Sequence, residues 1–332
     1  MSEKKDRIAL TSAEISGMWA SYIKNNMELR FFEYFVDIVE SDRIKEILIS
    51  KINRAKQSMF MIENIFKEEF IPLPNGFISE DVKADAPRVI SDEFIAAFCY
   101  DFILLTIHTY TSALLDSTRK DIRDYFQDNI SYNISMQDDV IEYMIEKGIY
   151  PKHPNIAIEK DIILVDNKKY LGRLIGDNRP LNISEISALA RIIFRAQFSK
   201  MVFVVFSKTA KSKELKEHFN DGVKEIQKVV DSLQPVLSKE NINISSTGEY
   251  KIFDTDESPF SEKIMLYFIN TCIGMYCFNM IGQSLTASLR NDINGKSLII
   301  MKDMLEYYNK GIKIMVKNGW LEAPPQPIDM SI

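Results

Sequence analysis

The sequence predicts an all-α protein, built as a tandem repeat of two four-helix bundles. Only 12 Gly and 11 Pro occur in 332 residues, which favours long uninterrupted helices over turn-rich sheets. The length also exceeds that of one ordinary domain, which is about 150 residues. Finally, adding 171 to a residue number relates most of the first half of the chain to the second half, which indicates a duplication.

The first helix of each copy is predicted to begin at a capping box. Thr11 and Asn182 are suitable N-cap residues, and each is followed three residues later by a glutamate, Glu14 or Glu185. At this spacing the cap side chain and the glutamate each accept a hydrogen bond from a backbone N–H at the helix start.

The second helix carries the clearest stripe of apolar residues, and it follows a short connection at Ser41 or Ser212. Apolar side chains recur every three or four residues, and every position is apolar in both copies, as the seam of a bundle requires. The stripe consists of Ile44, Leu48, Ile52, Ala55, Met59, Ile62 and Phe66 in the first copy, and of Leu215, Phe219, Val223, Ile226, Val230, Leu233 and Leu237 in the second.

A long connection precedes the third helix, at residues 71–90 and again at 242–260. It contains Pro and Asp and lacks helical periodicity. About 20 extended residues span ~65 Å, whereas a helix of about 26 residues is only ~40 Å long. We therefore expect the connection to run the length of each bundle and to make helices two and three parallel, which is the ferritin-like topology with one long crossover.

The third helix ends at a Ser-x-Arg-x-Asp block that both copies keep, with Arg119 and Asp121 matching Arg290 and Asp292. Arginine and aspartate two residues apart on a helix do not face each other. We therefore expect these side chains to bind neighbouring carbonyl groups, helix termini or the partner bundle. Their predicted role is structural rather than catalytic.

The fourth helix is predicted to end at Gly148 or Gly319, because a helix C-terminus favours a left-handed glycine and a proline follows soon after in both copies. Trp320 follows the second of these glycines and is also predicted to be structural.

The predicted domains are residues 8–155 and 181–328, joined by a linker over 156–180 that lies outside the repeat. The linker contains the apolar patch Ile162–Val165. We expect it to be ordered and to pack across the bundles, and a disordered tether is the alternative interpretation.

Charge and cysteine content indicate which partners and which cellular compartment to expect. A net charge of −6 opposes nucleic-acid binding, which requires a concentrated basic surface. Cys99, Cys272 and Cys277 lie in apolar runs and form no disulfide framework, which favours a reducing compartment. No apolar run follows the charged first residues, so we expect no secretory signal and a cytoplasmic location.

A four-helix topology raises the question of a di-iron site, which needs Glu-x-x-His on two helices. None of His108, His153 and His218 follows a glutamate at that spacing. In the first copy alone, Glu33, Asp101 and His108 are candidates for a single metal or a polar ligand, because they lie on inward helix faces. A buried, hydrogen-bonded polar group is the alternative. We predict no metal, no cofactor and no catalytic residue.

Residues 260–281 are apolar enough to suggest a membrane span, although Asn270 and Asn279 oppose it. The equivalent helix of the first copy carries Asp101 and His108, which would be costly in lipid. We therefore predict no membrane insertion and a helix that is buried inside its bundle.

Four motifs of the second copy carry a family resemblance, and the first copy matches them more loosely. The motifs are Asn178-Arg179-Pro180-Leu181, Ser258-Pro259-Phe260-Ser261-Glu262-Lys263, Ser288-Leu289-Arg290-Asn291-Asp292 and Asn318-Gly319-Trp320-Leu321-Glu322-Ala323-Pro324-Pro325-Gln326. With them the sequence resembles an uncharacterised family of duplicated helical proteins from spore-forming bacilli, classed as a domain of unknown function. The resemblance implies two ferritin-like copies and no accepted activity. The Gly-Trp…Pro-Pro ending also resembles spore-coat-F-like proteins, which implies a link to sporulation.

The leading hypothesis is a non-enzymatic structural or interaction protein, related to sporulation, which self-associates or binds a protein partner. The alternative is a ferritin-like metal or small-ligand binding protein with a site in the first copy only. A membrane-associated protein is the third hypothesis.

Overall fold

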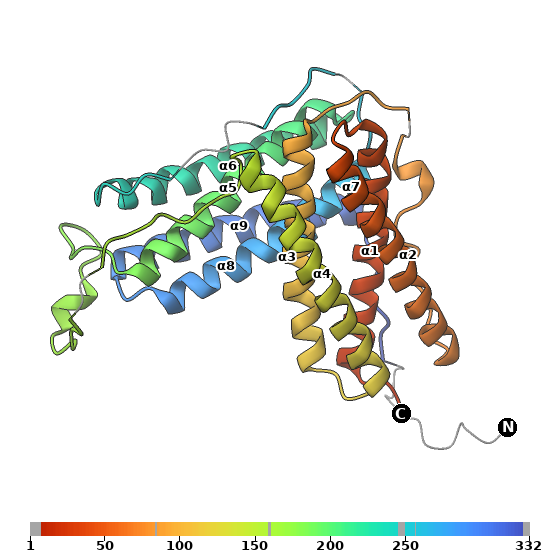
Figure 1. Cartoon of the computed structure of the whole chain (residues 1–332), viewed down its shortest axis with the longest axis horizontal. Helices are drawn as coiled ribbons and strands as arrows, with labels where there is room; N and C mark the ends of the chain where they lie inside the picture. The colour runs from red at the N-terminus through yellow and green to blue at the C-terminus, as the bar shows by residue number, and fades with distance from the viewer. Residues whose placement is uncertain (1–7, 84, 159–160, 245–249, 256, 328–332) are drawn as a thin grey trace. The chain divides into compact units, whose positions relative to one another are not determined.

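The computed structural model of the chain (Figure 1) is helical throughout, apart from its connections. Over the residues described, extended backbone pairs only at two isolated bridges, Val82 with Phe260 and Ile90 with Ile252, and no strand forms. The predicted all-α fold is therefore confirmed. The residues described are 8–83, 85–158, 161–244, 250–255 and 257–327.

The chain folds into two compact units that do not follow chain order. The first unit comprises the described residues of Met1–Ile149, Tyr250–Ile264 and Gly319–Ile332, and the second those of Tyr150–Glu249 and Met265–Asn318. Part of the second copy therefore belongs to the first unit.

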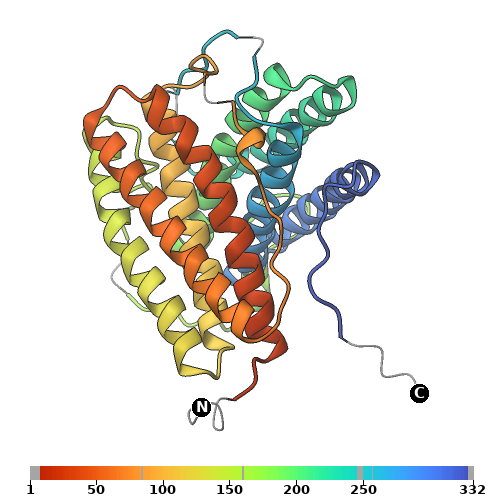
Figure 2. The same ribbon diagram turned by 90° about the vertical axis from the view of Figure 1, so that its right-hand side faces the viewer.

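The first unit contains a four-helix bundle. The connection between its second and third helices includes a 3₁₀ turn, η1 (Ser79–Asp81), and runs the length of the bundle, so these helices point the same way (Figure 2). The core is rich in aromatic side chains such as Phe31, Phe32 and Phe35. The helices are α1 (Ser12–Ile38), α2 (Asp42–Glu68), α3 (Asp92–Leu115) and α4 (Lys120–Glu146).

A segment of the second copy, residues 250–264, completes the core of the first unit. The Phe260 ring lies 4.4 Å from the Phe31 ring and 5.2 Å from the Tyr34 ring, measured between centroids. Tyr250 stacks on Phe94 at 5.3 Å. The segment is therefore held by buried aromatic contacts as well as by its backbone bridges.

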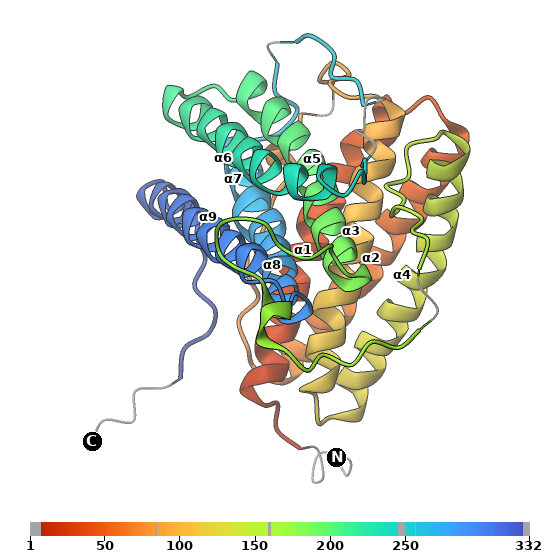
Figure 3. The ribbon, with the colours of Figure 1, turned by 90° about the vertical axis from the view of Figure 1, so that its left-hand side faces the viewer.

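The second unit contains the other helices, of which α5 and α6 form one antiparallel pair and α8 and α9 another (Figure 3). The third helix of this copy is continuous but irregular, because a π-helical stretch, η3, interrupts it. The elements are a 3₁₀ turn, η2 (Lys168–Leu171), then α5 (Ile183–Thr209), α6 (Lys213–Ser238), α7 (Glu262–Tyr267), η3 (Phe268–Ile273), α8 (Gly274–Ala287) and α9 (Asn291–Lys317). The first residues of α7, up to Ile264, still belong to the first unit.

The predicted helix boundaries are confirmed by the cap geometry. Thr11 and Glu14 form a capping box at the start of α1, and Asn182 and Glu185 form one at the start of α5. Gly148 and Gly319 follow the last helices at φ +69° and +67°, the left-handed conformation that glycine adopts without strain.

The helix-two stripe is buried more completely in the first copy than in the second. Leu48 and Ala55 in the middle of α2 are buried, whereas Val223, Ile226 and Val230 in the middle of α6 are only half-buried. The centre of the second bundle is therefore less tightly covered.

The linker differs from its prediction in one respect. Ile162 is 91% exposed and Leu164 is 85% exposed, so the apolar patch does not pack. No helix or strand forms there to hold these side chains on one face. Further along, Arg179 lies over the Tyr170 ring and pairs with Glu185 at 2.8 Å, which fixes the end of the linker on the second unit.

Two helices in the described part of the chain are long and apolar enough to cross a membrane by length and composition alone: α3, and the continuous helix from Glu262 to Ala287. Most of the apolar window of each is buried inside the protein, as in core helices of soluble proteins, which pass the same test.

Candidate functional site

The three candidates from the sequence do not form a metal centre. Glu33 pairs with Arg30 at 2.6 Å on α1, Asp101 is buried on α3, and His108 is exposed. In the described parts of the chain, no three or more His, Cys, Asp and Glu side chains gather to hold a metal ion.

The core of the first bundle contains a cluster of buried charges instead. Glu28 accepts a hydrogen bond from Lys24 at 3.0 Å and forms an ion pair with Lys51 at 2.7 Å. Lys51 also donates to Asn133 Oδ1 at 2.6 Å, and Lys24 donates to Thr106 Oγ1 at 2.8 Å. Two ammonium groups, one carboxylate and their amide and hydroxyl partners therefore fill the middle of this bundle.

The neighbouring lysines keep this carboxylate ionised. Burial raises the pKa of Glu28, but Lys24 and Lys51 outweigh burial and hold that pKa below its ordinary value. Burial also lowers the pKa of Lys51, against the attraction of Glu28. A buried charge cluster of this kind is stable only while each member keeps its partners.

The second bundle keeps one basic residue of this cluster and replaces its other members by smaller or apolar residues. At the offset of 171, Lys24 becomes Arg195, Glu28 becomes Ser199 and Lys51 becomes Gly222. Asn133 likewise becomes Met304 and Thr106 becomes Cys277. The positive charge on the first helix is retained, whereas the carboxylate and the second ammonium group are lost.

The π-helical stretch η3 is a second difference between the bundles. Ser91 before α3 and Ser261 before α7 are 170 residues apart, whereas Arg119 and Arg290 beyond these helices are 171 apart. The third helix of the second copy therefore contains one extra residue, which η3 accommodates. Such π-bulges occur frequently at functional sites.

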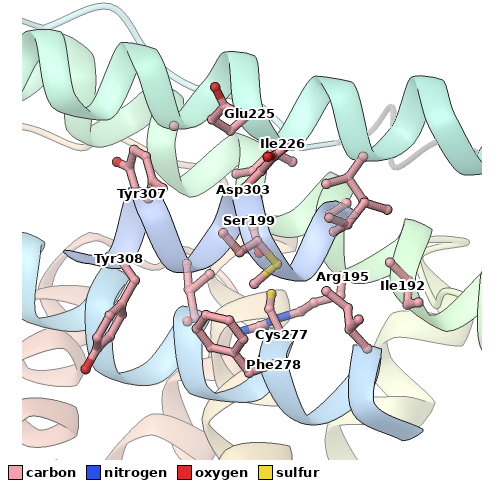
Figure 4. Close-up of a pocket in the computed structure, with 18 of the residues that line it drawn as sticks. Ile192, Arg195, Ser199, Glu225, Ile226, Cys277, Phe278, Asp303, Tyr307 and Tyr308 are labelled. Carbon is pink, nitrogen blue, oxygen red and sulfur yellow. The ribbon is translucent and has the colours of Figure 1, made fainter. Parts of the chain in front are cut away.

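A cavity of about 230 Å³ lies in the second bundle (Figure 4), and Ser199, at the position of Glu28, lines it. Its wall is mostly apolar and comes from α5, α6, η3, α8 and α9. Polar side chains interrupt this wall at a few places. The residues that the following argument uses are Arg195, Ser199, Ile226, Asn270, Cys277 and Asp303.

Three polar side chains in this wall are almost wholly buried. Arg195, Ser199 and Asn270 are 6%, 1% and 2% exposed. Neither Ser199 Oγ nor Asn270 Oδ1 has a hydrogen-bond partner of normal geometry among the described residues. A buried polar atom without a partner costs about 1–3 kcal/mol, so the cavity wall offers unused hydrogen-bonding capacity.

The cavity thiol is not an activated nucleophile. Burial raises the pKa of Cys277, and nearby Arg195 only partly opposes that rise. Cys99 in the first bundle behaves in the same way, since burial raises its pKa to about 12. A thiol whose pKa is raised is protonated at neutral pH and reacts slowly.

The Ser-x-Arg-x-Asp blocks lie at a bundle end, and their arginine and aspartate side chains contact each other, contrary to the prediction. Arg119 donates to both carboxylate oxygens of Asp121, at 3.1 and 2.7 Å, and Arg290 binds Asp292 in the same bidentate way. The expectation that these pairs do not face each other is wrong, because each arginine is the N-cap residue and lies outside the helical conformation.

These blocks also anchor the starts of α1 and α5. Glu14 accepts from the backbone N–H of Arg119 at 2.7 Å, and Glu185 accepts from that of Arg290 at 3.1 Å. Arg290 further donates to the Arg179 carbonyl at 2.9 Å. Trp320, after the last helix, is half-buried in the first unit.

Sequence reasoning missed the cavity residues, although a signal for them was present. The repeat aligns Glu28 with Ser199 and Lys51 with Gly222, so two large charged residues on inward helix faces are matched by small ones. Small residues at matched inward positions indicate either a closer helix approach or a cavity.

Comparison with known proteins gives a family and a distant structural likeness. A family model described as "Protein of unknown function (DUF3231)" matches residues 1–162 and again residues 170–331. No curated protein matches the chain. A crystal structure of a "putative spore coat protein" from Bacillus halodurans is 15% identical, with a TM-score of 0.40, over 46% of this chain and 98% of that one. Similarity at this level does not transfer a function.

Proposed function

We propose a function for this chain, which belongs to the DUF3231 family and contains two tandem copies of its domain. The proposed function is that of a non-enzymatic binding protein for a small, largely apolar molecule. The observation that supports this function is the cavity of about 230 Å³ in the second bundle. Ligand pockets are typically lined by apolar side chains with a few well-placed polar groups, and this cavity has that composition.

The apolar wall of the cavity favours a ligand. Removing apolar surface from water contributes about 25 cal/mol per Å², so a molecule that covers this wall gains binding free energy from it.

Binding rather than catalysis is supported by the side chains of the wall. The described lining contains no histidine, and its thiol, Cys277, has a raised pKa. An imidazole and an activated thiol, two common catalytic groups near neutral pH, are therefore missing from this lining.

Thermal unfolding and calorimetric titration with 1-octanol test this function. We expect 1-octanol to raise the melting temperature of the wild type and to bind with a stoichiometry of one per chain, because a ligand that binds only the folded state stabilises it. Ile226→Trp fills the cavity and should abolish both effects. Leu298→Trp, at a position that is 56% exposed on α9, is the matched control. Absence of binding to the wild type would remove the proposal.

The interaction hypothesis has one supporting observation, which is the exposed patch Ile162–Val165. Exposed contiguous apolar residues favour a protein partner. Association with spores and a cytoplasmic location are proposals that rest on the sequence resemblance. Localisation of a tagged chain during growth and sporulation tests them: a tag found only in vegetative cytoplasm, with no partner recovered, would count against the spore role.

A further inference from the structure

We infer that the molecule bound in the second bundle is a monocarboxylate whose anionic head is held by Arg195. This inference rests on the proposed function, since it names the chemical class of that ligand. It starts from a physical requirement: a charge in an apolar cavity is stabilised best by an opposite charge that also forms hydrogen bonds with it.

The first bundle contains a template for this arrangement. There the carboxylate of Glu28 lies 3.0 Å from the ammonium group of Lys24, one helical turn away on α1. In the second bundle the same positions on α5 are Arg195 and Ser199. The serine leaves the space of the glutamate side chain to the cavity, so a carboxylate that enters from solvent can occupy the corresponding place.

The surroundings of Arg195 fix its guanidinium group beside this place. Its Cζ lies 4.9 Å from the centre of the Tyr276 ring and 5.3 Å from that of Phe198. Figure 4 shows the arginine extending along the cavity beside Cys277, with Ser199 across from them. A planar guanidinium carries five N–H donors in its plane, so an arginine that also interacts with the Cys277 thiol retains the geometry that matches a carboxylate bidentately.

The Ser199 hydroxyl supplies a further donor. It is 1% exposed, it lines the cavity, and the Cys277 thiol, a weak hydrogen-bonding group, is its neighbour; no partner of normal geometry lies among the described residues. A carboxylate oxygen would accept from this hydroxyl and so satisfy a group that is otherwise buried at a cost.

Acidic side chains also line the cavity, but they lie on other helices. Glu225 on α6 pairs with Lys228 at 2.8 Å, and Asp303 on α9 lies 3.9 Å from Lys302. Both are less buried than Arg195. An ammonium ligand would favour these carboxylates, so a cationic probe distinguishes the two arrangements.

The cavity volume limits the length of the ligand. A cavity of roughly 150 Å³ binds benzene, and this cavity is about 230 Å³. A ligand of about ten non-hydrogen atoms is therefore a reasonable match, and octanoate and 3-phenylpropionate represent its alkyl and aryl forms.

Calorimetric titration of the full chain with octanoate, 3-phenylpropionate, 1-octanol and octylamine tests the inference. We expect at least one carboxylate to bind at least about tenfold more tightly than 1-octanol, because hydrogen bonds to charged groups are stronger than those between neutral groups. The preference between the two acids identifies an alkyl or an aryl ligand. Equal or tighter binding of the alcohol or the amine would overturn the inference and leave the proposed function intact. If no probe binds, the proposed function itself fails.

Substitutions of Arg195 separate charge recognition from folding. Arg195→Met should weaken carboxylate binding at least about tenfold and leave the affinity for 1-octanol unchanged. Arg195→Lys, which places the residue of Lys24 at this position, should retain most of the affinity for the carboxylate. Arg191 lies one helical turn away and donates a hydrogen bond to Gln283. Arg191→Met is therefore the control, and it should change neither affinity. Equal loss of the acid and the alcohol in Arg195→Met would contradict the inference.

A further test needs no ligand. Ser199→Glu places a carboxylate where Glu28 lies in the first bundle, and Ser199→Gln places a neutral group of the same size there. Ser199→Glu should melt at least about 2 °C above Ser199→Gln at pH 7, because its charge meets Arg195. The reverse order would show that the cavity rejects an anion and would overturn the inference.

Discussion

Glu28 and Ser199 occupy matched positions in the two copies, yet they give the two cores different properties. In the first bundle Glu28 links two lysines, Lys24 and Lys51, and the core is filled by the chain's own charges. In the second, Ser199 is too small to fill the space of Glu28, whereas Phe203 and Tyr307 pack directly against Gly222, where Lys51 stands in the first copy. The loss of the glutamate side chain therefore distinguishes the open core from the closed one.

Removal of the Glu28 charge should destabilise the first bundle strongly. Glu28→Gln keeps the volume but leaves two buried ammonium groups without their carboxylate, and breaking a buried ion pair in this way costs about 3–5 kcal/mol. Chemical denaturation followed by tryptophan fluorescence measures the loss, because Trp19 and Trp320 both belong to the first unit. Glu217→Gln, an exposed glutamate on α6, is the control and should change stability by no more than about 0.5 kcal/mol. An equally small effect at Glu28 would show that the lysines are not held by it.

At the scale of elements, the π-helical stretch η3 supplies part of the cavity wall through Ile269, Asn270 and Ile273. The extra residue of the second copy is absorbed within this stretch, so the helix on either side keeps the register of α3. The insertion therefore changes the wall of the cavity without changing the bundle around it.

Deletion of Thr271 should convert η3 into ordinary α-helix and leave the bundle folded. We expect helical circular dichroism to be retained and the affinity for 1-octanol to fall at least about tenfold, since the wall residues are repositioned. Deletion of Thr111, which makes the same hydroxyl-to-carbonyl bond in the regular helix α3, is the matched control. Deletion of Thr111 should lower the free energy of unfolding by roughly 3 kcal/mol or more, because the residues beyond the deletion rotate by about 100° around the helix axis. Equal tolerance of both deletions would contradict this account of η3.

At the scale of the whole molecule, the boundaries of the compact units differ from those of the sequence repeats. The reason is that the connection before helix three packs differently in the two copies. In the first copy this connection stays with its own bundle, whereas residues 250–264 of the second copy pack in the first unit. Backbone hydrogen bonds fix the segment there, including one from Lys83 N–H to the Pro259 carbonyl at 2.8 Å and one from Ser261 N–H to the Asp81 carbonyl at 2.8 Å. The first copy therefore completes its core with residues from the second.

Phe260→Ala should destabilise the first unit even though the residue belongs to the second repeat. Loss of a buried phenylalanine costs about 3–5 kcal/mol, and Phe260 is 6% exposed. Unfolding monitored by Trp19 fluorescence gives the measurement. Phe253→Ala, at a ring that is 38% exposed in the same segment, should cost less than about 1 kcal/mol. Similar losses of unfolding free energy from both substitutions would indicate that the Phe260 ring makes no specific contribution to the core of the first unit.

Much of this fold could be predicted from the sequence, because it depends on interactions between residues close together in the chain. Thr11 and Glu14 determine a helix start within one turn, and Gly148 determines a helix end through its backbone conformation. The apolar stripe from Ile44 to Phe66 identifies the inward face of a helix by periodicity alone. The family match over residues 1–162 and 170–331 agrees with the repeat inferred from the offset.

Only the tertiary structure decided the site and the boundaries of the units. The cavity depends on the summed volume of side chains from α5, α6, η3, α8 and α9, and no single stripe records that sum. The sequence pointed instead to Glu33, Asp101 and His108, which have suitable residue types but are not brought together. The packing of residues 250–264 in the first unit likewise depends on aromatic contacts between residues far apart in the chain. Local interactions specify helices and their ends. The cavity and the packing of residues 250–264 in the first unit depend instead on contacts between side chains that are far apart in the sequence.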